Sequence, residues 1–124
     1  MTRHLVKNNK INLWSSDIHE SPMLWLKEKG IKTLQSVTNP LEFKSDMNYD
    51  VVFALSFFSH MLKKTWFLWL EKLYSFVKPN GIIIFTTQGL KSNELYQGNI
   101  ELDDDGFGFI NESEQNDLNT CDYG

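Results

Sequence analysis

The stretch that decides the fold is YDVVFALSFFSHM, residues 49–61. Its first half is mostly apolar and rich in β-branched and aromatic residues, which is typical of a strand buried in a sheet. Its second half changes to small polar groups beside a histidine, with Ser56, Ser59 and His60. In open parallel sheets, ligands bind beyond the carboxyl ends of the strands. The stretch therefore predicts a buried strand whose end carries part of a functional site.

Similar patterns recur on both sides of this stretch. Ser21 and Pro22 indicate the start of a helix, and Gly30 indicates its end. A second helix is predicted from Lys64 to Lys78, where apolar residues recur at helical spacing before the turn-forming KPNG. The remaining strands are predicted at INLWSSDI (11–18), IKTLQSV (31–37) and GIIIFTT (81–87).

The order of these segments predicts the fold class. Linkers of about a dozen or more residues separate successive strands, as parallel crossovers require. We therefore expect an α/β fold with an open, mostly parallel, Rossmann-like sheet and flanking helices. This domain is expected to span residues 1–91. Residues 92–124 are acidic and rich in Asn and Gly, and are predicted to form a loop or a poorly ordered tail.

The charge distribution excludes several kinds of partner. Residues 1–91 hold all 12 Lys and Arg with seven acids, whereas residues 92–124 hold nine acids and no base, giving +5 and −9. Such a tail repels nucleic acid and anionic membranes, and no apolar run is long enough to cross a bilayer. Cys121 is the only cysteine, which fits the cytoplasm and excludes a disulfide or cysteine-based metal cluster. His4 and His19 lack metal-ligand spacing.

Polar residues gather where the predicted strands end. Asp17 can accept hydrogen bonds from both hydroxyls of a ribose, although an acid there can also simply support the following turn. His60 is a possible general base for an alcohol or amine, but equally a capping or packing residue. The other strand-end candidates are Thr38, Asn39, Ser56, Thr86 and Thr87.

Three stretches, SSDIHESPMLWLKEKG, YDVVFALSFFSHM and WFLWLEKLYSFVKPNGIIIFTTQG, together resemble the class I S-adenosylmethionine-dependent methyltransferases. The resemblance covers roughly residues 2–90 and depends on the order and spacing of the stretches. It implies S-adenosylmethionine as cofactor and transfer of a methyl group to an acceptor, such as a small molecule, whose identity the sequence does not give.

The resemblance also implies roles for individual residues. Asp17 matches the acid that holds the cofactor ribose, and Ile18 packs on the adenine. His60, in the segment facing the acceptor, is the candidate base. The other implied cofactor contacts are Val37, Thr38 and Asn39 at the adenine edge, and Ala54, Leu55 and Ser56 beneath the methionine part.

The family's opening strand and Gly-rich loop have no counterpart in this sequence, so the resemblance implies a fragment truncated at both ends. In the family that strand lies between those matching residues 11–18 and 49–55. We expect these two strands either to pair directly or to have the gap filled by residues 1–10, the tail or a second chain. An alternative function is therefore a non-catalytic α/β remnant that associates with another chain as an oligomer through its incomplete sheet. A nicotinamide-dinucleotide enzyme is disfavoured because GxGxxG is absent.

Overall fold

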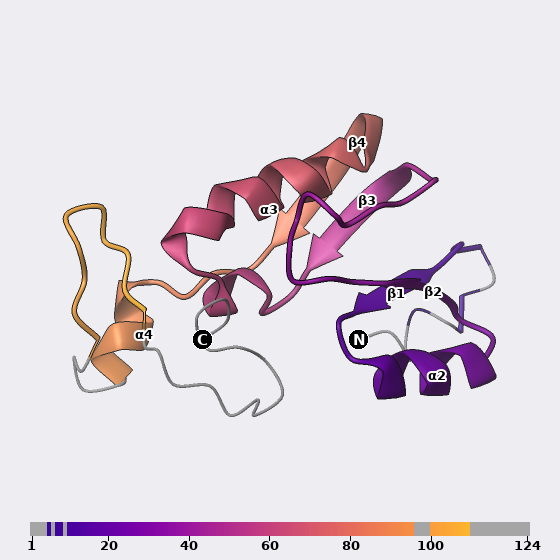
Figure 1. The fold of residues 1–124 in the computed structure, drawn as a ribbon, viewed down its shortest axis with the longest axis horizontal. Coiled ribbons are helices and arrows are strands. Elements are labelled where there is room, and N and C mark those ends of the chain that lie inside the picture. The colour runs from indigo at the N-terminus through magenta and orange to yellow at the C-terminus, as the bar shows by residue number, and fades with distance from the viewer. Residues whose placement is uncertain (1–4, 6, 9, 96–99, 110–124) are drawn as a thin grey trace. The chain divides into compact units, whose positions relative to one another are not determined.

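The computed structural model describes residues 5, 7, 8, 10–95 and 100–109 (Figure 1). It has a mixed α/β fold with parallel strands and flanking helices, which confirms the fold class predicted from the sequence. The chain divides into two compact units, residues 1–45 and 46–124. The elements are β1 (Trp14–Asp17), α2 (Glu20–Glu28), β2 (Lys32–Gln35), β3 (Tyr49–Ala54), the 3₁₀ helix η1 (Phe58–His60), α3 (Lys63–Ser75), β4 (Val77–Phe85) and α4 (Leu90–Leu95).

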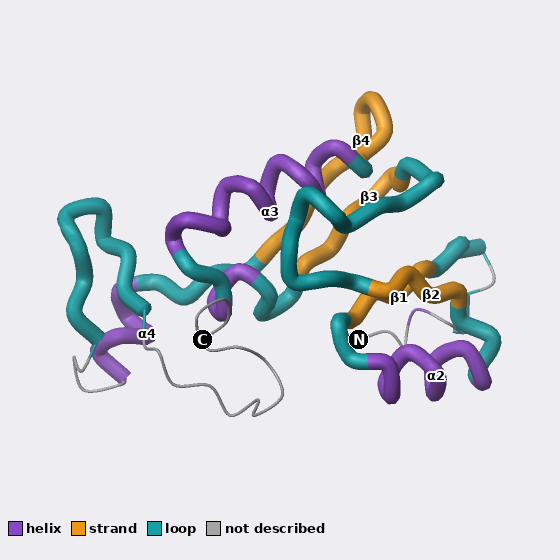
Figure 2. The backbone as a smooth tube through the Cα atoms, in the orientation of Figure 1, coloured by secondary structure: helices purple, strands orange, loops and turns teal. Residues whose placement is uncertain are grey.

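The first unit is a β–α–β motif (Figure 2). β1 and β2 pair in parallel, and Asp17 lies opposite Gln35 at their carboxyl ends. α2 connects the two strands and packs on both of them. Met23 from α2 and Ile31 just before β2 are buried. Removing such apolar side chains from water stabilises this small motif.

The ends of α2 agree only in part with the sequence prediction. Gly30 follows the helix with a positive φ of 74° and donates its N–H to the carbonyl of Lys27 at 2.9 Å. The N–H of Ile31 donates to the carbonyl of Leu26 at 3.0 Å, which completes the glycine-based helix termination expected from the sequence. The prediction of Ser21 as the N-cap is wrong, because α2 already includes Glu20.

The second unit contains the strand predicted from the opening stretch, but the residues of this strand are half-buried or exposed and not buried as predicted. β3 pairs in parallel with β4, and the register is irregular near the start of both strands. Tyr49 pairs with Val77 and Val51 pairs with Ile82. More residues therefore lie between the two paired positions in β4 than between those in β3. The extra residues belong to KPNG, where Asn80 has a positive φ of 65°. KPNG therefore forms a bulge in β4, whereas the sequence predicted it as the end of the preceding helix.

An aromatic cluster joins α3, β4 and η1 in this unit. Phe58 and Trp69 are each only 2% exposed. The ring centroid of Phe58 lies 4.7 Å from that of Trp66 and 5.0 Å from that of Phe85. Phe57 contacts Trp69 edge-on at 5.0 Å. These contacts hold η1 against α3 and β4, because buried aromatic rings contribute large apolar areas and favour tilted packing.

The strands form two separate two-stranded sheets, β1–β2 and β3–β4. Direct pairing between residues 11–18 and 49–55 is not among the strand pairings of the described residues. In each strand, the backbone N–H and C=O groups along one of its two edges bond to the neighbouring strand of the same unit. This arrangement is consistent with an incomplete core.

Part of the predicted acidic tail has regular structure. α4 spans the predicted domain boundary at residues 91 and 92, and Leu102 and Gly108 form an antiparallel bridge that closes a tight loop. The side chain of Asn93 bonds both backbone groups of Ile100. The rest of that tail, including Cys121, lies outside the described residues, as does His4.

Candidate functional site

Asp17, the last residue of β1, is half-buried and supports the turn into α2. Its Oδ1 accepts the N–H of His19 at 2.9 Å, and its carbonyl accepts the N–H of Ser36 at 2.9 Å. The first of these bonds is the turn-supporting role considered from the sequence. An ionised carboxylate has two oxygens and about four acceptor positions, so the same side chain can also accept a ligand hydroxyl.

Gln35 braces this strand end and was not identified from the sequence. Its Nε2 donates to the carbonyl of Ile18 at 2.7 Å and to that of Asp17 at 3.2 Å. Gln35 lies opposite Asp17 in the parallel register, which brings its amide within reach. Its local sequence carries no signal for this role, because the contact depends on strand pairing across about 18 residues.

The three residues predicted at the adenine edge follow β2. Val37 is half-buried, and Thr38 and Asn39 are exposed. Asn39 stabilises its own turn, since its Oδ1 accepts the N–H of Leu41 at 3.1 Å and its Nδ2 donates to Oε1 of Glu42 at 2.9 Å. Such Asx turns are common in loops. The side chain of Asn39 therefore has a structural function in this conformation.

The second unit contains the residues predicted beneath the methionine part of the cofactor. Ala54 ends β3, Leu55 is 55% exposed, and Ser56 has a positive φ of 51°. A non-glycine residue in this left-handed region is uncommon and marks a turn held by its surroundings. The N–H of Ser56 donates to Oγ1 of Thr86, at the end of β4, at 2.8 Å.

His60 lies at the end of η1, a few residues beyond this turn, and is half-buried. Its N–H donates to the carbonyl of Phe57 at 3.2 Å, and Oγ of Ser59 donates to the carbonyl of Ser56 at 3.2 Å. The segment is a short 3₁₀ helix that ends before α3 begins at Lys63. The structure therefore places Ser56, Ser59 and His60 on one compact turn directly after β3.

Each unit thus brings together its own set of predicted residues at the carboxyl ends of its strand pair. Asp17 and Ile18 meet at Gln35 in the first unit. In the second, Ser56 meets Thr86, and His60 follows within the same turn. Among the described residues, no group of three or more His, Cys, Asp or Glu is arranged to hold a metal ion. The described part of the chain also has no helix long and apolar enough to span a bilayer.

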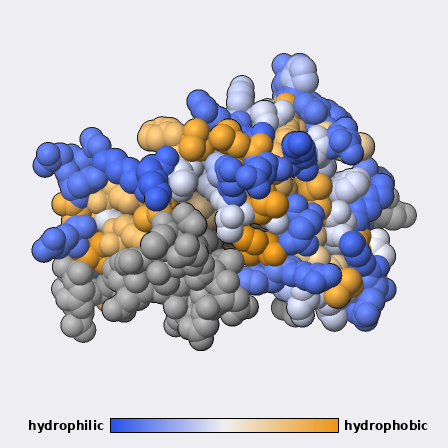
Figure 3. Space-filling view, viewed as in Figure 1, coloured by the Kyte–Doolittle hydropathy of each residue, from blue (hydrophilic) through white to orange (hydrophobic). Residues whose placement is uncertain are grey.

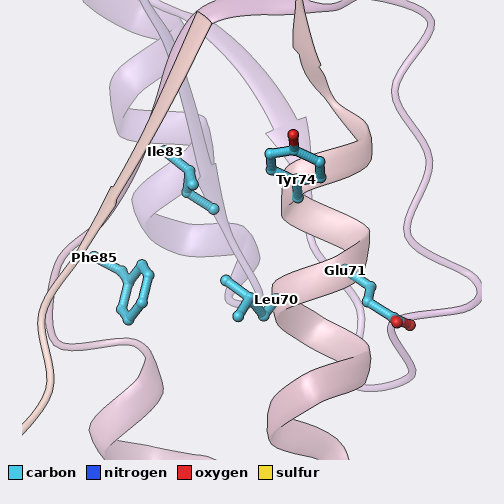
Figure 4. A pocket seen from close by; sticks show the side chains of 5 residues that line it. All are labelled: Leu70, Glu71, Tyr74, Ile83 and Phe85. Atoms are coloured by element: carbon cyan, nitrogen blue, oxygen red, sulfur yellow. The ribbon is translucent and has the colours of Figure 1, made fainter.

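A shallow cavity of about 360 Å³ lies apart from these residues, between α3 and β4 (Figure 4). Its lining is Leu70, Glu71, Tyr74, Ile83 and Phe85. In Figure 4 the carboxylate of Glu71 points away from the space between the apolar side chains. The cavity therefore offers an apolar surface, and none of the predicted site residues lines it.

The pKa shifts found among the described residues belong to exposed ion pairs. Lys78 lies 3.0 Å from Asp50 and lowers the pKa of that carboxyl by hydrogen bonding and by its charge. Lys63 lowers the pKa of Asp103 in the same way. These pairs are structural contacts on the surface, where ion pairs are screened by water.

Comparison with known proteins supports the fold. No protein-family model and no curated protein matches this chain. The chain is similar to a solved structure named "DhpI-SAM-HEP complex", with a TM-score of 0.59 and 19% sequence identity over 87% of this chain. The chain covers 54% of that protein, about half its length. At this identity the similarity shows the fold alone, an α/β fold in agreement with the fold class expected from the sequence.

Proposed function

We propose that this chain is part of an S-adenosylmethionine-dependent methyltransferase and binds the cofactor. The observation that carries the proposal is the fold similarity, over 87% of the chain, to a structure whose name includes SAM, the usual abbreviation of that cofactor. Polar residues at the carboxyl ends of both strand pairs support it, since ligands of open α/β folds bind there.

The proposal assigns a role to the residues at each strand end. Asp17 accepts hydrogen bonds from the ribose hydroxyls, and Ile18 packs on the adenine, with its carbonyl already fixed by Gln35. The segment after β2, made of Val37, Thr38 and Asn39, contacts the adenine edge. The end of β3 and the turn after it, made of Ala54, Leu55 and Ser56, contact the methionine part.

S-adenosylmethionine supplies an electrophilic methyl group on a sulfonium, so the protein mainly has to align the acceptor. Correct alignment alone can supply several orders of magnitude in rate. The acceptor in this proposal is a small molecule with an alcohol or amine group. His60 removes the acceptor proton as the methyl group is transferred, because an imidazole nitrogen can accept a proton from an alcohol or amine.

Binding of S-adenosylhomocysteine, followed by titration calorimetry, tests this proposal. We expect weak but saturable binding, because the sequence has no Gly-rich loop to add backbone donors for the ligand. NAD⁺ is the control, since it shares the adenosine part and is expected to bind less well. A flat titration up to about 1 mM S-adenosylhomocysteine would contradict the proposal.

One observation favours the second candidate function, association with another chain. The side chains of Val51, Phe53, Ile82 and Ile84 are 40–53% exposed. Val51 pairs with Ile82 and Phe53 with Ile84, so all four lie on one face of the β3–β4 sheet. Parallel sheets are usually covered on both faces. Hydrophobic surface (orange in Figure 3) is visible on the exterior of the chain.

Sedimentation analysis of the purified chain distinguishes this candidate. If a second copy covers the face, the chain sediments as a dimer, and Ile84→Lys shifts it to a monomer by placing a charge in the contact. Leu95→Lys, on the 84% exposed side chain of α4, is the matched control and leaves the dimer intact. A wild-type monomer at all concentrations would rule out self-association through this face.

A cytoplasmic location and the lack of nucleic-acid and membrane partners stay predictions.

A further inference from the structure

The turn after β3 depends on a residue that lies far away in the sequence. Ser56 has a φ of 51°, a conformation that side chains with a Cβ rarely adopt and that persists only where neighbouring groups hold it. The turn leads directly into η1 and His60. Whatever holds Ser56 in this conformation therefore also sets the start of the segment that carries the candidate base.

Thr86 holds this turn through two of its atoms. Its N–H donates to the carbonyl of Ala54 at 3.2 Å, which continues the parallel ladder by one bond. Its Oγ1 then accepts the N–H of Ser56 at 2.8 Å. In a regular parallel ladder a main-chain carbonyl would accept that N–H. The threonine hydroxyl takes its place, which lets the backbone of Ser56 leave the ladder and turn.

The turn is connected rigidly to the residues that follow it. Oγ of Ser59 donates to the carbonyl of Ser56 at 3.2 Å. Phe58, 2% exposed, is fixed between Trp66 and Phe85. A change at Ser56 is therefore expected to move η1 as a unit, because buried aromatic side chains allow little independent adjustment.

We propose that Thr86 is a positioning residue for the cofactor and acceptor segments, an inference that rests on the proposed function. Its hydroxyl fixes the left-handed conformation of Ser56 and thereby the placement of Ala54–Ser56 and of His60. Thr86 itself need not contact any ligand. The inference explains why Thr86, directly after β4, accepts through its side chain a hydrogen bond from the turn after β3.

Two substitutions at Thr86 test the inference. Thr86→Val keeps the shape but removes the hydroxyl, whereas Thr86→Ser keeps the hydroxyl. We expect Thr86→Val to weaken S-adenosylhomocysteine binding by about tenfold, and Thr86→Ser to bind within about twofold of wild type. The matched control is Thr33→Val, because Thr33 lies within β2, is half-buried like Thr86 and makes no side-chain hydrogen bond among the described residues.

Hydrogen exchange of the Ser56 amide, measured by NMR, is the second readout. Thr86→Val should accelerate it by about tenfold or more, and Thr86→Ser should restore its protection. If Thr86→Val folds poorly, the double variant Ser56→Gly/Thr86→Val provides the test, since glycine adopts a positive φ without strain. Its loss of affinity should then be smaller than the sum of the two single losses.

The outcomes separate this inference from the proposed function. If the wild type binds S-adenosylhomocysteine and Thr86→Val binds it equally well, the inference alone is overturned. The same holds if Thr86→Ser weakens binding as much as Thr86→Val does. Additive losses in the double variant overturn it as well. Absence of S-adenosylhomocysteine binding to the wild-type chain overturns the proposed function and, with it, the positioning role.

Discussion

Lys63, the first residue of α3, holds two acidic residues from the segment predicted as a tail. Its Nζ lies 2.5 Å from Oδ2 of Asp103 and 2.6 Å from Oδ2 of Asp105. The other oxygen of Asp103 accepts the backbone N–H groups of Asp105 and Phe107. One lysine therefore fixes a loop that starts about 40 residues further along the chain.

Replacing this lysine should release the loop without unfolding the unit. In Lys63→Met we expect faster amide hydrogen exchange at Asp105 and Phe107, because the carboxylate that accepts their N–H groups is no longer held in place. The thermal midpoint should change little, since exposed ion pairs contribute little to global stability. Lys64→Met, at the exposed neighbouring position, is the matched control and should leave the exchange unchanged. Equal effects of both variants would contradict the role of Lys63.

The same ion pair predicts a pH dependence for this loop. Lys63 holds the pKa of Asp103 below its ordinary value of 3.8, so the contribution of Asp103 is fully present above about pH 4 and is lost as pH falls through the lowered pKa. Hydrogen bonds from Asp103 and Asp105 raise the pKa of Lys63 above 10.5, so its contribution is lost as pH rises through that higher value. Titration of the Asp103 carboxyl by NMR should show a midpoint that rises in Lys63→Met, and an unchanged midpoint would contradict this account.

Two substitutions of Asp17 distinguish its proposed role in ligand binding from its role in supporting the turn. Asp17→Ala should weaken S-adenosylhomocysteine binding by about 1–3 kcal/mol, the cost of losing a charged hydrogen-bond partner. Asp17→Asn retains an oxygen for the His19 N–H and so preserves the turn, while it weakens the charge-assisted bonds to the ribose. Titration calorimetry measures the affinity of both variants for S-adenosylhomocysteine, and Glu20→Ala, at an exposed position, is the control. Unchanged affinity in both would leave Asp17 with only its structural role.

His60 is expected to affect turnover and cofactor binding differently. His60→Ala should leave the affinity for S-adenosylhomocysteine within about twofold, because the proposed contact is with the acceptor. Once an acceptor is identified, the rate of methyl transfer should fall by about 10²-fold or more. Parallel losses of binding and turnover would assign His60 a packing role instead.

Gly81 is expected to be essential to the bulge in β4. A Cβ at this position would lie 2.7 Å from Cγ1 of Val77 and 2.8 Å from the backbone oxygen of Asp50, and backbone atoms cannot move aside easily. Gly81→Ala should therefore lower the free energy of unfolding by roughly 1–3 kcal/mol. Gly89→Ala is the matched control, since nothing lies within 4 Å of its added carbon. Denaturant unfolding of both variants measures the difference, and equal midpoints would refute it.

The sequence predicted elements more reliably than their pairing. The glycine at position 30 ends α2 as expected, and residues 49–55 contain β3. The KPNG segment was misassigned, because a Pro-Asn-Gly turn signal is the same at a helix end and in a bulge of a strand. At the site, the sequence predicted polar residues directly after β3, whereas the compact turn that they form and the supporting roles of Gln35 and Thr86 were not predicted.

By itself, the sequence determined the order of strands and helices and the polar residues at the strand ends, because these depend on side chains within a few residues of one another. Only the tertiary structure decided that the strands pair as β1–β2 and β3–β4, that Thr86 holds Ser56 in a left-handed turn, and that Lys63 fixes the acidic loop. Each of these contacts joins residues well separated along the chain. Such contacts form only when the chain closes a loop, and no local pattern specifies which distant partner will satisfy a given hydrogen bond or charge.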